Sequence, residues 1–79
     1  MDWQDLASTV AKSAPALGAA LGGPAGAAVG GLIAAAFGVD RSAQAVAEAV
    51  ANDPSAAVKL REVELRHAEV LAELMTQRY

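Results

Sequence analysis

Small residues recur at every fourth position through the middle of the chain. The set comprises Ala14, Gly18, Gly22, Gly26, Gly30, Ala34 and Gly38. Residues four apart lie along one face of an α-helix, so this spacing predicts a ridge that carries almost no side chains. A second helix can approach such a ridge closely, as in the glycine zippers and other small-xxx-small patterns of membrane helices. We therefore expect these seven residues to form a helix-packing ridge.

The ridge lies in a segment without charge. Residues 13–39 contain no Asp, Glu, Lys or Arg, and they hold all 7 glycines of the chain. In water each glycine inside a helix costs about 1 kcal/mol relative to alanine, whereas a bilayer tolerates Gly and Pro within helices. The uncharged stretch also exceeds the roughly 20 residues that a span needs. Residues 14–39 are thus a candidate membrane segment, and a helix-packing segment inside a protein assembly is the alternative.

Two geometries are open for residues 14–39. A single helix kinked at Pro24 keeps the four-residue register intact, and the unbroken register favours it. A helical hairpin that turns at residues 22–24 gives two arms, each too short to span a membrane alone.

Residues 1–13 predict a short amphipathic helix. Asp2 is a suitable N-cap, and the apolar side chains at three- and four-residue spacing form one face. The members of that face are Trp3, Leu6, Ala7 and Val10. Trp3 is a candidate interfacial anchor at the level of lipid headgroups, and its alternative role is to pack the helix on the rest of the protein.

Residues 40–79 form a charged helical region with 12 of the 15 charged side chains. We expect helices over about 41–51, with Asp40 as its cap, and 54–77, where Asp53 followed by Pro54 is a start signal. The second helix is long and amphipathic, and one apolar seam along it is expected to pair with a partner. The seam consists of Leu60, Val63, His67, Val70, Leu71 and Leu74.

The composition argues against catalysis or metal binding and against nucleic-acid binding. The chain has no cysteine and a single histidine, His67, without a second ligand at suitable spacing, so we expect no metal, no cofactor and no enzymatic activity. Six basic residues face nine acidic ones, and a net charge of −3 leaves no phosphate-binding surface. Because 21 of the 79 residues are alanine, a monomer buries little area, and we expect an all-α homo-oligomer of extended helices.

Several segments resemble a family of small bacteriophage proteins, the holins of the gene-transfer-agent, three-transmembrane type. The similarity is carried by Trp3, residues 14–18, 21–26 and 31–34, and then by Asn52-Asp53-Pro54, Lys59-Leu60, Glu64 and His67. The resemblance implies a membrane-active protein that assembles with itself and permeabilises the host inner membrane. Longer family members continue into further apolar helices, so at most one span is expected in this chain.

Two functions follow as hypotheses. The first is a holin-like protein in the host inner membrane, with lipid and copies of itself as partners through the glycine ridge. The alternative is a virion component, involved in structure or DNA ejection, that forms a helical ring or plug in the tail, baseplate or portal region with other phage structural proteins.

Overall fold

The computed structural model describes residues 2–76 of the backbone and the side chains up to Glu73. Within this range the chain forms helices joined by short turns, and it contains no strand. The helices are α1 (Trp3–Ala11), α2 (Pro15–Leu21), α3 (Gly26–Phe37), α4 (Ala43–Asn52), α5 (Ala56–Arg66) and α6 (Ala68–Thr76). The prediction of an all-α fold is confirmed.

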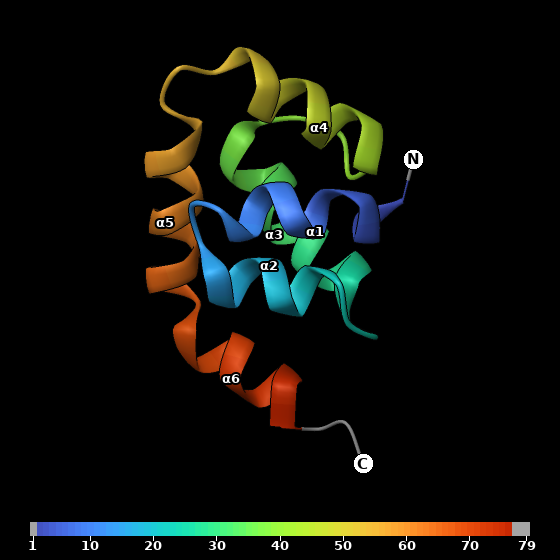
Figure 1. Cartoon of the computed structure of the whole chain (residues 1–79), viewed down its shortest axis with the longest axis vertical. Helices are drawn as coiled ribbons and strands as arrows, with labels where there is room; N and C mark the ends of the chain where they lie inside the picture. The colour runs from blue at the N-terminus through green and yellow to red at the C-terminus, as the bar shows by residue number, and fades with distance from the viewer. Residues whose placement is uncertain (1, 77–79) are drawn as a thin grey trace.

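The helices pack around one shared core and do not extend away from one another. Figure 1 shows α1 and α2 lying antiparallel in the centre with α3 behind them, α4 across one end, α5 along one side and α6 below α2 at the opposite end. The Cα radius of gyration is 11.1 Å, close to the roughly 11.6 Å expected for a folded domain of this length. The expectation of extended helices is therefore corrected to a compact bundle of short ones.

The uncharged segment is divided between α2 and α3. Gly22 ends α2, and residues 23–25 form a turn before Gly26 begins α3. The continuous helix that the register favoured is not formed, and the turn falls where the hairpin alternative places it. Two glycines followed by proline are the poorest helix formers in the chain. A continuous helix over 14–39 would also be about 39 Å long, far more than the nine residues of α1 can cover.

No helix in the described part of the chain is both long enough and apolar enough to cross a membrane. The longest, α3, has 12 residues, which gives about 18 Å against a hydrocarbon thickness of about 30 Å. The expected placement in the host inner membrane is therefore wrong. The length of the uncharged stretch suggested a span, but the turn at residues 22–25 removes it.

The N-terminal helix forms as its pattern predicts. Asp2 is the N-cap, and the Asp5 carboxylate accepts a hydrogen bond from the Asp2 backbone N–H at 3.0 Å. Leu6 and Val10 are buried in the core, and Trp3 is half-buried against it. The side of α1 that the sequence marks as apolar thus faces α2 and α3.

The charged region differs from its prediction at three helix ends. Ser42 and not Asp40 caps α4, because the Ser42 hydroxyl accepts from the backbone N–H of Ala45 at 3.1 Å. After Asp53 the chain makes one turn before α5 begins. The expected helix over 54–77 is interrupted at His67, which leaves the helical conformation at φ −115° and ψ 24°. The interruption gives α6 its own direction, and α6 packs on α2 through the buried Leu71.

The start of α5 is held by Asp53. Its carboxylate accepts from the backbone N–H of Ser55 at 2.8 Å and from the ammonium of Lys59, which also lies 5.3 Å from the ring centre of Phe37 on α3. The Lys59 hydrogen bond is the largest cause that lowers the pKa of the Asp53 carboxyl below its usual 3.8, and the Ser55 N–H acts in the same direction. These contacts tie the first turn of α5 to the turn before it and to α3.

A depressed pKa makes the stabilisation by Asp53 pH-dependent. The contribution is fully present above the usual value and is lost as the pH falls through the lower value of the folded state. We expect Asp53→Asn, which keeps an acceptor for Ser55 but loses the charge, to lower the thermal midpoint at pH 7. The difference from the wild type should shrink as the pH falls below the usual pKa of 3.8. Melting curves followed by circular dichroism test this, and a difference that is independent of pH would contradict it.

Candidate interaction surfaces

The glycine ridge meets α1 of the same chain. A Cβ added to Gly18 would lie 2.5 Å from the Cβ of Ala11, and one added to Gly22 would lie 3.2 Å from the Cβ of Ala7. Real Cβ atoms do not approach closer than about 3 Å, so a side chain at Gly18 would force the two helices apart. Ala7 and Ala11 are themselves four residues apart, and α1 therefore presents small side chains to the ridge.

Trp3 continues this contact one turn further along α1. Its Cβ lies 3.5 Å from the position of a Cβ on Gly26, and its ring lies 2.6 Å from that of a Cβ on Gly30. The indole thus occupies the space that the two glycines leave open at the start of α3. Trp3 was predicted either to anchor the helix at lipid headgroups or to pack it on the rest of the protein. In the structure its half-buried ring packs on α3.

The other members of the ridge have different surroundings. Ala14 and Ala34 are buried in the core, at the start of α2 and near the end of α3. Gly38 ends α3 in the left-handed region at φ 68°, where glycine is favoured, and no other group lies near the space of its missing side chain. The packing ridge therefore runs from Ala14 to Ala34, and α1 covers its centre. A second copy of the chain would have to displace α1 to reach that centre.

The C-terminal seam also packs within the chain. Leu60, Val63 and Leu71 belong to the same core as α1, α2 and α3. His67 is half-buried at the interruption between α5 and α6, and Val70 is turned outward with 43% of its surface exposed. The side chain of Leu74 lies outside the described residues. The seam thus holds α5 and α6 to the bundle, and only Val70 of its described members is left on the surface.

An apolar surface that the sequence analysis did not identify lies on the outer side of α5. Val58 and Leu65 are 65% and 68% exposed. They are seven residues apart, which places them on one side of the helix, opposite the buried Leu60 and Val63. The sequence does contain this apolar pair at positions i and i+7. The predicted seam, however, assigned only one apolar side to this helix, the side of Leu60 and Val63 that faces the core.

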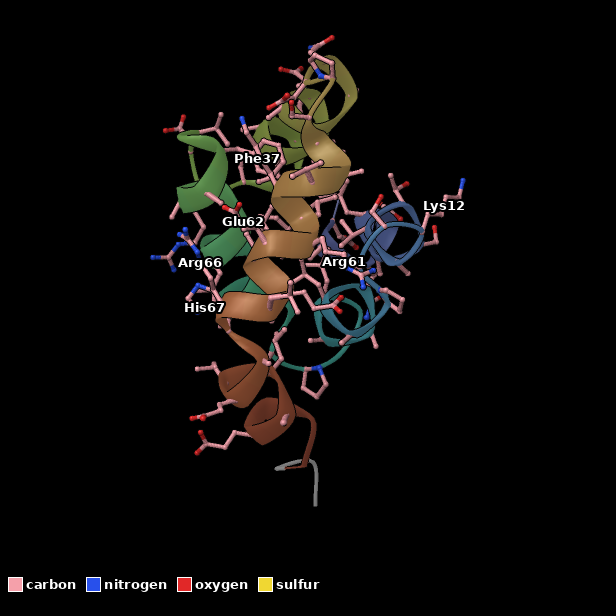
Figure 2. The ribbon with its side chains drawn as sticks, turned by 90° about the vertical axis from the view of Figure 1, so that its left-hand side faces the viewer. Lys12, Phe37, Arg61, Glu62, Arg66 and His67 are labelled. Atoms are coloured by element: carbon pink, nitrogen blue, oxygen red, sulfur yellow. The ribbon has the colours of Figure 1, made fainter. Side chains whose placement is uncertain are left out.

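A groove of about 560 Å³ runs beside these two side chains, between α5 and the turn that follows α1. Its lining consists of Lys12, Ser13, Ala57, Val58, Arg61, Glu62 and Leu65. Figure 2 looks onto the outer side of α5 and shows Arg61 leaning toward α1 and α2, whereas Glu62, Arg66 and His67 lie on the opposite side of the helix. We call this lining the α5 groove.

The charges around the α5 groove are divided between its two sides. The Glu62 carboxylate forms an ion pair with the Arg66 guanidinium, with 3.7 Å between Oε1 and Nη2, and both side chains are largely exposed. Among the described side chains, Lys12 and Arg61 form no ion pair. The side of the groove toward α1 therefore carries positive charge next to an apolar strip, in a chain whose net charge is negative.

The other surfaces of the described residues carry fewer features of a binding site. In the part of the chain that the structure describes, no three His, Cys, Asp or Glu side chains are grouped so that they could hold a metal ion. A second hollow lies between α3 and α5, but the Glu62–Arg66 pair already occupies its rim. Within the described residues, the α5 groove brings two largely exposed apolar side chains, Val58 and Leu65, next to the unpaired cations Lys12 and Arg61.

The close approach of α1 and the ridge predicts a large effect of one methyl group. Gly18→Ala should lower the free energy of unfolding by a net of about 1–2 kcal/mol, because overpacking against the Ala11 backbone costs up to about 3 kcal/mol and alanine regains roughly 1 kcal/mol in helix propensity. Gly23→Ala is the matched control, because a Cβ there meets nothing closer than 3.5 Å. Urea denaturation measures both values. Equal stability of the two variants would contradict the contact between Gly18 and Ala11.

Comparison of the chain with protein-family models, with curated proteins and with solved structures finds no match. The resemblance to small phage proteins therefore stays a prediction from the sequence.

Proposed function

We propose that the chain is a structural component of a phage particle and that it acts by binding other proteins through the α5 groove. The observation that carries this proposal is the exposure of Val58 and Leu65, because most of the other large apolar side chains among the described residues are buried. An exposed apolar strip with charged neighbours is typical of a protein–protein interface. The phage origin rests on the resemblance described above.

Two features support a particle component over a membrane-active protein. A holin-like mechanism requires helices that insert into the bilayer, and the described helices include none that could span it. The glycine ridge that would join copies in the membrane is covered by Ala7, Ala11 and Trp3 of the same chain. Among the described residues, the α5 groove is a surface that this intramolecular contact leaves uncovered.

The proposed role needs no catalysis. The groove lining offers apolar contact area from Val58 and Leu65 and charge from Lys12 and Arg61, which serve recognition of another polypeptide. Such a surface gains affinity mainly from a few buried apolar anchors, while the charged rim sets the choice and orientation of the partner.

Quantitative mass spectrometry of purified particles tests the proposal. We expect the chain at a fixed copy number in particles of the phage that encodes it. Val58→Asp should lower that copy number by at least about tenfold, because loss of an interface anchor costs about 2 kcal/mol or more. Gln44→Asp on the exposed side of α4 is the matched control and should leave the copy number unchanged. Particles free of the wild-type chain would refute the proposed function.

A further inference from the structure

The occupant of the α5 groove should complement its charge. Lys12 and Arg61 supply two positive charges next to Val58 and Leu65, and the nearby Glu62 is already paired with Arg66. A polypeptide that carries acidic and apolar side chains on one side of a helix would match this lining. Such a helix is present in the chain itself.

The exposed side of α6 has this character. Glu69 and Glu73 are four residues apart and exposed, and Val70 lies beside them with 43% of its surface accessible. On its inner side α6 is held to the bundle by Leu71, which is fully buried. Because α6 follows α5 directly after His67 and is anchored by Leu71, its acidic side cannot fold back onto the groove of the same copy.

A symmetric contact between two α5 grooves is disfavoured. In an antiparallel pair of helices related by a two-fold axis, each side of one helix lies next to the same side of the other. Arg61 would then lie close to the Arg61 of the second copy, and the two Lys12 side chains would be on the same side of the contact. Like charges placed together at an interface oppose association.

We propose that the α5 groove binds the acidic side of α6 of a second copy of the chain. Val70 then meets Val58 and Leu65, and Glu69 faces Arg61 and Lys12. Because the two surfaces are different, each copy offers one of each, and the contact repeats head to tail into a ring or a filament. This inference rests on the proposed function and names the partner that the groove takes within the particle.

The size of the two surfaces sets the expected strength. A standard interface buries about 800 Å² on each partner, roughly a sixth of the 4715 Å² that the chain exposes, and the groove between one helix and one turn offers less than that. A single contact should therefore dissociate on the order of 10–100 μM. Closure of a ring, in which every copy makes two contacts, would strengthen the assembly.

The test uses the full chain and two variants that each destroy one surface. Val58→Asp removes the groove and leaves α6 intact, whereas Glu69→Arg reverses the charge on α6 and leaves the groove intact. Sedimentation velocity at 0.01–1 mM, roughly spanning the expected dissociation range, should show larger species for the wild type and monomers for each variant alone. An equimolar mixture of the two variants should form a dimer, since one intact groove meets one intact α6.

Two further variants check the role of charge. Glu48→Arg on α4 makes the same charge change as Glu69→Arg at an exposed position away from both surfaces, and it should assemble like the wild type. The double variant Arg61→Glu with Glu69→Arg exchanges the charges across the contact and should recover at least about tenfold of the affinity lost by Glu69→Arg alone. Circular dichroism establishes that every variant is folded.

Each other outcome overturns the inference. A wild type that is monomeric at 1 mM, a Glu69→Arg variant that assembles alone, or a Val58→Asp variant that assembles alone would show that the groove and α6 do not bind each other. A mixture that stays monomeric would do the same. These results leave the presence of the chain in purified particles unaffected, so the proposed function and this inference fail separately.

Discussion

The structure depends on the close approach of α1 to the glycines of α2 and α3. Gly18, Gly22 and Gly26 meet Ala11, Ala7 and Trp3 in order, each step four residues along both segments in opposite directions. Because Gly18 and Gly22 face only alanine side chains, the backbones of α1 and α2 pack closely and many weak dispersion contacts accumulate over a small area. An alanine-rich chain with three aromatic residues can in this way supplement a core of leucine, isoleucine and valine side chains with close backbone contacts. The positions of α5 and α6 follow, since both pack on the unit that α1 completes.

Much of the fold could be predicted from the sequence. The helical class, the apolar side of α1 and the small-residue ridge follow from spacing alone. The partner of the ridge was more difficult, because a ridge of glycines indicates only that some helix approaches closely. Ala7 and Ala11 have the matching four-residue spacing, and together with Trp3 they identify the partner once α1 is placed antiparallel. Segment length also limits the extent of this pairing, since α1 can cover only as many turns of the ridge as it has itself.

The interruption at His67 was a feature that sequence patterns could not locate. His67 is no strong helix breaker, and the salt-bridge spacing around it favours a continuous helix. The chain leaves the helix there because Leu71 packs on α2, and tertiary packing outweighs local propensity. The same limit applies to the α5 groove. Val58 and Leu65 stand out only after Leu60 and Val63 are known to face the core.

The pairing of α1 with the ridge also has a consequence for folding kinetics. Its contacts join residues only 7 to 27 positions apart in the chain, so the loops that must close are short and their entropic cost is small. The unit of α1, α2 and α3 is complete at Phe37, before any of α4, α5 or α6 has left the ribosome. The later helices then have a preformed surface on which to pack. An N-terminal half in which nearly every second residue is alanine or glycine thus contains the contacts that can form first.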